Sequence, residues 1–214
     1  MGSTKETQRY RDSAPFAPLS HSSLFRCKLS RRTCCGMPKK VVCMSTVRIS
    51  GSKKHSSVNG PGVRYVLFFQ GCPHHCPGCQ NPETHDPAGG SERNVADVVR
   101  EILQTKYLDG LTFSGGDPLL QPEAVIEIAT AAKNAGLNLW LYTGWTFEQI
   151  QNGAAGETAK EALKHLDVLV DGPFVEKLKT GNAIWRGSDN QRLIDVQRSL
   201  AEGNVVELPE SKVK

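Results

Sequence analysis

Apolar runs and amphipathic stretches alternate along the chain from residue 59 onward. Residues 64–70 form a β-branched and aromatic run that ends at Gly71, which predicts a buried strand. Residues 91–108 repeat apolar side chains at i, i+3 and i+4, which predicts an amphipathic helix with Ser91 as its N-cap. Similar patterns predict helices at 122–135, 146–151 and 157–166, and strands at 111–114, 137–142, 168–170 and 191–196.

This alternation predicts an α/β fold of parallel βαβ units, arranged as an open sheet or as a partial barrel. In such folds ligands gather at the carboxyl ends of the strands, where the loops are free to vary. The segments that directly follow the predicted strands are therefore the candidates for a functional site.

Charge divides the chain into two unlike parts. Residues 1–58 contain twelve Lys and Arg but only two acidic residues, a charge of +10, whereas residues 59–214 carry −6. The pI of 8.7 is thus a property of the N-terminal part, so we predict no nucleic-acid partner. Residues 1–58 also hold fifteen Ser and Thr and no sustained apolar period, which predicts a disordered extension before a folded domain at 59–214.

The extension has the composition of an organellar transit peptide. The alternatives are a disordered basic arm, or upstream sequence joined to the gene in error, with Met44 as the start. The longest apolar run is five residues, 65–69, against the roughly 20 that a membrane span needs, so no membrane partner is predicted. Seven cysteines without a secretory signal favour a reducing, intracellular compartment: the cytoplasm, or a mitochondrion or chloroplast if the extension is a transit peptide.

Every cysteine of residues 59–214 lies in one octapeptide after the first predicted strand. Cys72, Cys76 and Cys79 have the spacing C-x3-C-x2-C. Three thiolates on one short loop suit three corners of a [4Fe-4S] cubane and leave the fourth iron open. An open iron can chelate S-adenosylmethionine, whose reductive cleavage gives methionine and a 5′-deoxyadenosyl radical.

Zinc is the structural alternative for these cysteines, with His74, His75 or His85 as the fourth ligand. Zinc ligands usually come as two separated pairs, and residues 59–214 contain no second pair of cysteines. The spacing therefore favours the cluster. Hydrogen-atom abstraction needs no acid or base, so His74 and His75 are interpreted as loop residues that shield the cluster.

Glycine-rich and polar segments follow two further predicted strands. Gly115 and Gly116 let the backbone approach a ligand, and Asp117 adds charge or caps the next segment. A tight turn is favoured for this motif taken alone, and its position downstream of the cysteine loop favours the ligand. Asp171 begins a second turn motif. Trp185 and Arg186 lie in a third segment, where a packed indole with a solvated arginine is the alternative to contact with a ligand carboxylate or a partner.

The segments 59–64, 71–79, 114–118, 168–174 and 185–191 together resemble the anaerobic ribonucleotide reductase-activating family, a group of radical S-adenosylmethionine glycyl-radical activases. The resemblance covers about residues 58–198. It implies a compact partial (βα) barrel with parallel strands and a cluster on Cys72, Cys76 and Cys79. It also implies that S-adenosylmethionine borders Gly78, Cys79, Gln80 and the pair Gly115 and Gly116 with Asp117. Many radical S-adenosylmethionine enzymes have an aromatic residue before the third cysteine, and Gly78 at that position favours the activase subgroup.

The implied reaction is abstraction of hydrogen from a glycine of the large subunit of anaerobic ribonucleotide reductase. The electron would come from a flavodoxin, a ferredoxin or a thiol-based donor, and no catalytic residue beyond the cluster and S-adenosylmethionine is expected. The alternatives are activation of another glycyl-radical enzyme, such as pyruvate formate-lyase, and a nonenzymatic zinc-binding adaptor.

Overall fold

A mixed seven-stranded sheet forms the centre of the computed structural model, which describes residues 45–179, 181 and 184–209. The strand order is β3-β1-β2-β4-β5-β6-β7. β2, β4, β5 and β6 run parallel, while β1, β3 and β7 are antiparallel to their neighbours. The strands are β1 (Thr46–Ser56), β2 (Arg64–Phe69), β3 (Ser91–Asn94), β4 (Gly110–Gly115), β5 (Asn138–Tyr142), β6 (Val168–Asp171) and β7 (Arg192–Asp195).

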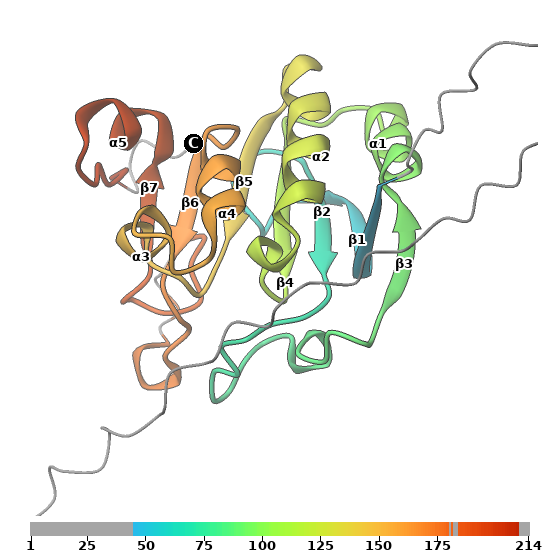
Figure 1. Ribbon diagram of the computed structural model, residues 1–214. Helices are drawn as coiled ribbons and strands as arrows, with labels where there is room; N and C mark the ends of the chain where they lie inside the picture. The colour runs from blue at the N-terminus through green and yellow to red at the C-terminus, as the bar shows by residue number, and fades with distance from the viewer. Residues whose placement is uncertain (1–44, 180, 182–183, 210–214) are drawn as a thin grey trace, which may run out of the picture. The chain divides into compact units, whose positions relative to one another are not determined.

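Helices cover one face of this sheet (Figure 1). α1 (Val95–Gln104), α2 (Pro122–Asn134) and α4 (Glu157–Leu163) pack side by side across it. The short α3 (Phe147–Gln151) follows β5, and α5 (Val196–Glu202) follows β7. Among the described residues, no helix is both long and apolar enough to cross a membrane.

Side chains of β5 show how the two faces of the sheet differ. Leu139 and Leu141 are buried in the main core, which the helices share. Trp140 points to the opposite face, where it packs with Val168 and Val170 of β6. Because side chains alternate along a strand, every second residue of the central strands is available to a site on the face without helices.

The carboxyl ends of the parallel strands meet at one edge of the sheet. Phe69 pairs with Gly115, and Tyr142 pairs with Val170, so β2, β4, β5 and β6 all end there. The cysteine loop and the segment between β6 and β7 lie at this edge (Figure 1). The loops that the sequence singled out are therefore brought together.

The predicted α/β class is confirmed, but parallel pairing throughout is wrong. β7 runs antiparallel to β6 because the described part of their connection holds only a 3-10 turn, Glu176–Leu178, and no crossover helix. A parallel partner needs such a crossover. The sheet is therefore parallel in its centre and antiparallel at both edges.

The predicted domain boundary at residue 59 is also corrected, because Thr46–Ser56 form β1 within the sheet. Val47 and Ile49 are buried in the main core, whereas Lys53 and Lys54 are exposed. Only the first half of the strand shows apolar alternation. Because its second half is polar, the sequence pattern placed the whole strand in the N-terminal extension. Residues 1–44 lie outside the described residues, and disorder and targeting there stay predictions.

The predicted helix at 91–108 divides into β3 and the shorter α1. Ser91–Asn94 pair with β1, and the helix starts at Val95. Asn94 is the N-cap in place of Ser91, since its side chain accepts from the backbone N–H of Ala96 at 2.9 Å. Pairing with β1, which the sequence pattern did not indicate, decided this boundary.

Arg64 lies buried at the start of β2 and joins the sheet to the loop before it. Its guanidinium donates to Thr112 Oγ1 (2.7 Å) and to the carbonyl of Asn138 (2.9 Å), and lies over the Trp140 ring. Burial lowers the pKa of this guanidinium to about 10, which leaves it charged at neutral pH. Thr112 in turn donates to the carbonyl of Asn59, which holds Asn59 beside the face without helices.

Candidate iron-sulfur site

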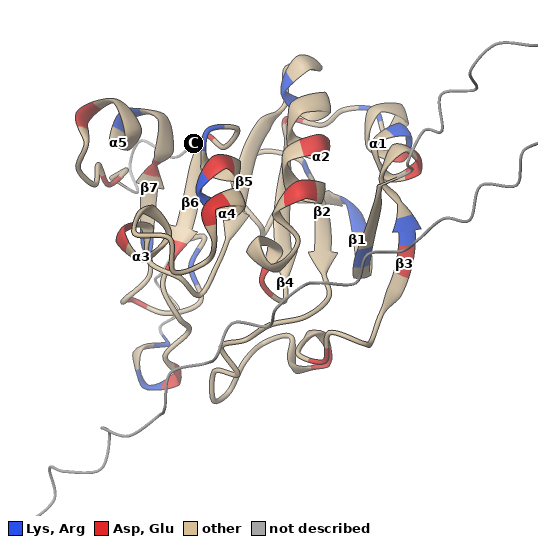
Figure 2. Cartoon of the chain, viewed as in Figure 1, with Lys and Arg blue, Asp and Glu red and all other residues tan. Residues whose placement is uncertain are grey.

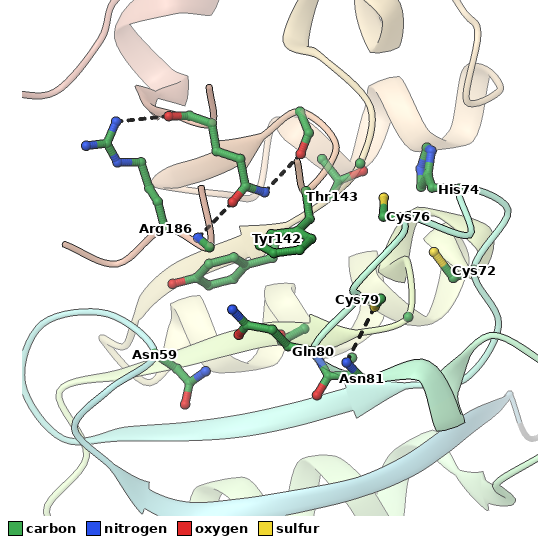
Figure 3. A pocket seen from close by; sticks show the side chains of 18 of the residues that line it. Asn59, Cys72, His74, Cys76, Cys79, Gln80, Asn81, Tyr142, Thr143 and Arg186 are labelled. Carbon is green, nitrogen blue, oxygen red and sulfur yellow. Dashed lines mark hydrogen bonds between the residues drawn. The ribbon is translucent and has the colours of Figure 1, made fainter. Parts of the chain in front are cut away.

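A cavity of about 470 Å³ opens at the edge where the parallel strands end. Figure 3 shows the three cysteines at one end of it and Asn59 and Arg186 at the other. Its wall draws on the loops after β2, β4, β5 and β6 and on the segment before β7. The residues that line the cavity include Asn59, Cys72, Cys76, Cys79, Gln80, Gly115, Gly116, Tyr142, Thr143, Gly144, Gly172, Trp185, Arg186, Gly187 and Gln191.

Backbone hydrogen bonds hold the cysteine loop at this wall. The N–H of Gly71 donates to the carbonyl of Thr84 (2.8 Å), and that of Cys72 to His85 (3.2 Å). Within the loop, the N–H of Cys79 donates to the carbonyl of Cys76 (3.1 Å). All three thiols are half-buried, so they face the cavity from a folded turn.

Burial perturbs the acidity of the Cys72 thiol. Burial raises its pKa, and the charges of Asp117 and Cys76 add to this, while backbone hydrogen bonds from His74 and His75 lower it. Metal ligation requires the thiolate. The two backbone donors are therefore the local groups that favour the ligating form of Cys72.

The donor set fits a [4Fe-4S] cluster. Figure 2 shows the loop free of charged side chains, and residues 71–82 contain no Asp, Glu, Lys or Arg. The three thiolates are therefore the anionic donors that this loop can offer, and a cubane presents a separate iron to each of them.

Gly115 and Gly116 allow two backbones to cross at the end of β4. Gly115 has φ +97°, and a Cβ there would lie 2.6 Å from the backbone N of Phe69. A Cβ on Gly116 would lie 2.2 Å from the carbonyl oxygen of Gly71. Both residues line the cavity, and the close approach that the structure shows is to the chain's own backbone. The expected approach to a ligand stays a prediction.

Asp117 and Gly78 lie off the cavity wall, and Asp117 caps the turn that follows β4, one of the two roles predicted for it. Asp117 is fully buried and binds His74 and Thr143. Gly78 is exposed with φ +71°, and a Cβ there would meet the carboxyl group of Glu176 at 2.6 Å. Gln80, by contrast, lies on the cavity wall beside Cys79, as expected.

The sequence did not indicate Asn59, Tyr142 or Thr143 as site residues. Tyr142 is the last residue of β5 and Thr143 follows it, so the rule that pointed to the other loops would have found them. The Tyr142 hydroxyl donates to the carbonyl of Trp185 at 2.9 Å, and burial raises the pKa of this phenol. Asn59 precedes β2, and it lies in the segment 59–64 that contributed to the family resemblance without being predicted as a site residue.

Gln191 joins the two segments that close the other end of the cavity. Its side-chain oxygen accepts from the N–H of Gly187 (2.8 Å), and its amide donates to the carbonyl of Gly172 (2.9 Å). Its own carbonyl accepts from the Arg186 guanidinium (3.0 Å), as Figure 3 shows. Trp185 has φ +60°, and within the described residues its buried indole N–H has no hydrogen-bond partner. A bulky residue in this conformation is strained, which is common in ligand-binding segments.

Comparison with known proteins supports the same chemistry. Residues 58–194 match the 4Fe-4S single cluster domain family. The anaerobic ribonucleoside-triphosphate reductase-activating protein of Enterobacteria phage T4 is 41% identical over 143 residues, 64% of this chain and 86% of that protein. Its Escherichia coli K12 counterpart is 37% identical over 143 residues, 63% and 89% of the two chains. The pyruvate formate-lyase-activating enzyme of Clostridium pasteurianum is 38% identical over 128 residues, 58% of this chain and 50% of that longer protein.

The fold and the three-thiol loop thus define an iron-sulfur protein with a single cluster domain. Within that class, the chain belongs to the family of anaerobic ribonucleoside-triphosphate reductase-activating proteins. The resemblance expected from the five sequence segments is confirmed.

Proposed function

We propose that this protein is a radical S-adenosylmethionine enzyme that installs a glycyl radical on the large subunit of anaerobic ribonucleotide reductase. The observation that carries the proposal is the placement of three half-buried thiols on the wall of one cavity, beside the glycine pair that ends β4. Family membership supports the partner. We also propose that the sheet curves as a partial barrel, and that the electron comes from a flavodoxin, a ferredoxin or a thiol-based donor.

Cys72, Cys76 and Cys79 would hold a [4Fe-4S] cluster, and Gln80 with the glycine pair would border S-adenosylmethionine. When bound, these groups supply reductive cleavage of a carbon-sulfur bond and a 5′-deoxyadenosyl radical. The cavity volume of about 470 Å³ is in the range of small-molecule sites. The glycine pair on the cavity wall would let the ligand approach the backbone there.

The far end of the cavity would receive the glycine-bearing segment of the partner. Asn59 offers a carboxamide there, a group that pairs with peptide N–H and C=O alike. Trp185 and Arg186 lie at the same end, held by Tyr142 and Gln191. These side chains bind and orient, and none of them is required to move a proton.

Replacement of Cys76 tests the cluster. In Cys76→Ala we expect loss of the brown colour, of the iron and sulfide content and of reductive S-adenosylmethionine cleavage, because the loop then offers only two thiolates. Cys43→Ala, outside the loop, is the matched control and should retain all three. Full cleavage activity in Cys76→Ala would contradict the assignment, and a colourless protein that reconstitutes only with zinc would establish the adaptor alternative.

The partner is tested by electron paramagnetic resonance. Reduced enzyme and S-adenosylmethionine are mixed under anoxia with the large subunit of anaerobic ribonucleotide reductase or, in parallel, with pyruvate formate-lyase. We expect a glycyl radical on the reductase alone. A radical on pyruvate formate-lyase alone would instead favour activation of that enzyme. The similarity to the Clostridium pasteurianum activating enzyme is the observation behind this second candidate function.

A further inference from the structure

The cysteine loop is tied to the sheet through the side chain of His74. Its Nε2 lies 2.8 Å from Asp117 Oδ2, and the two side chains are only 14% and 1% exposed. In the tautomer with a proton on Nε2, the ring donates to this carboxylate oxygen. The contact joins the middle of the loop to the residue that follows the glycine pair.

Asp117 is a fixed acceptor for this bond. Its Oδ2 also accepts from Thr143 Oγ1 (2.8 Å) and from the N–H of Gly144 (3.2 Å), and its Oδ1 accepts from the N–H of Leu119 (3.0 Å). These partners come from the end of β5 and from the turn after β4. The carboxylate therefore cannot swing into the cavity without breaking several buried hydrogen bonds.

The imidazole also fills a space shaped for it. A Cβ on Gly144 would lie 2.4 Å from the His74 ring. On another side the ring meets Trp145 edge to face, with centroids 4.8 Å apart. Packing and hydrogen bonding thus both hold this side chain at one position.

The peptide of His74 acts on the Cys72 thiol next to it. Burial raises the pKa of this thiol, and backbone hydrogen bonding by His74 and His75 lowers it. Hydrogen bonds to ligand sulfurs are among the features that set the reduction potential of an iron-sulfur cluster. A ring anchored at Asp117 therefore keeps the neighbouring N–H groups aimed at Cys72.

We propose that His74 is a positioning residue, which docks on the Asp117 carboxylate and holds the cysteine loop in its ligating shape before any cluster is bound. The proposal rests on the proposed function only in that the loop then receives a cluster. It gives Asp117 the role of loop anchor in place of direct contact with S-adenosylmethionine. It also gives His74 a role other than shielding or zinc ligation.

Hydrogen exchange and thiol alkylation of the full-length protein without cluster test the anchor alone. In His74→Ala we expect exchange of the amides of residues 72–79 and alkylation of the three thiols to rise by roughly tenfold or more, because a charge-assisted hydrogen bond no longer closes the loop. His74→Gln retains a donor for Asp117 and should restore much of the protection. His75→Asn is the matched control, because Asn tolerates the positive φ of position 75, and it should leave both rates unchanged.

The reconstituted protein provides the second measurement. We expect His74→Ala to release iron to a chelator faster than wild type and to shift the midpoint potential of the cluster, and His74→Gln to revert both changes. Unchanged exchange and alkylation in His74→Ala would overturn the anchor, even if iron binds normally. Absence of iron from the wild-type protein would instead overturn the proposed function. If His74→Ala does not fold, Asp117→Asn replaces it, with intermediate effects expected.

Discussion

Gly116 shows at the residue scale how closely two backbones pack beside the cavity. Its N–H donates to the carbonyl of Phe69 (2.9 Å), and the next N–H, that of Asp117, donates to Gly71 (2.8 Å). These bonds join the end of β4 to the start of the cysteine loop. They leave no volume for a side chain at Gly116.

We predict that Gly116→Ala lowers the free energy of unfolding by about 1–3 kcal/mol, since its Cβ must displace the Gly71 carbonyl. Urea unfolding of the protein without cluster measures this. Gly51→Ala is the control, because a Cβ on Gly51 meets nothing within 4 Å. Equal unfolding free energies of the two variants would show that the backbones at Gly116 and Gly71 can move apart at little cost.

Arg192 connects three elements around α3. Its guanidinium donates to Asp171 at the end of β6 (3.0 Å) and to Glu148 of α3 (2.7 Å). Asp171 is buried and also accepts from the N–H of Phe147, the first residue of α3. This explains Asp171, whose role the sequence left open: it accepts the first N–H of α3, whose N-cap is Thr146, and it binds Arg192 of β7.

The pH dependence of the unfolding free energy should show the contribution of the ion pair between Arg192 and Glu148. Arg192 lowers the pKa of Glu148 from 4.5 to about 2. A carboxyl group with a lowered pKa stabilises the fold above its ordinary pKa and loses that effect as the pH falls through the folded value. Between pH 4.5 and 2 we therefore expect a shallower loss of unfolding free energy in Glu148→Gln than in wild type.

Urea titrations at a series of pH values test this expectation. Glu123→Gln, which removes an exposed carboxylate of α2 away from Arg192, should keep the wild-type slope. A wild-type slope in Glu148→Gln would mean that Arg192 contributes through Asp171 alone.

On the scale of the whole molecule, β1 completes the sheet. It pairs with β2 on one side and with β3 on the other. The carbonyl of Arg48 also accepts from the N–H of Gln70, directly before the cysteine loop (3.0 Å). The loop therefore depends on a strand that lies in the basic, Ser- and Thr-rich part of the sequence.

Two truncated chains test this dependence. A chain that begins at Met44 keeps every described element, and we expect it to unfold cooperatively at the wild-type temperature. A chain that begins at Asn59 loses Val47 and Ile49 from the core and uncovers the edge of β2, so we expect no cooperative transition by circular dichroism. Cooperative unfolding of the shorter chain would restore the boundary that the composition indicated.

Local patterns were enough to predict the central strands, most helices and the grouping of Cys72, Cys76 and Cys79. Parallel strands are buried on both faces, so they form apolar runs that are visible in the sequence. The three cysteines lie within eight residues, so their spacing alone indicates that they can bind one cluster. Strands β1 and β3, the antiparallel direction of β7 and the places of Asn59 and Asp117 depended on the folded chain. They arise from pairings and hydrogen bonds between segments far apart in sequence, which exist only after the sheet has assembled and which no short stretch of residues encodes.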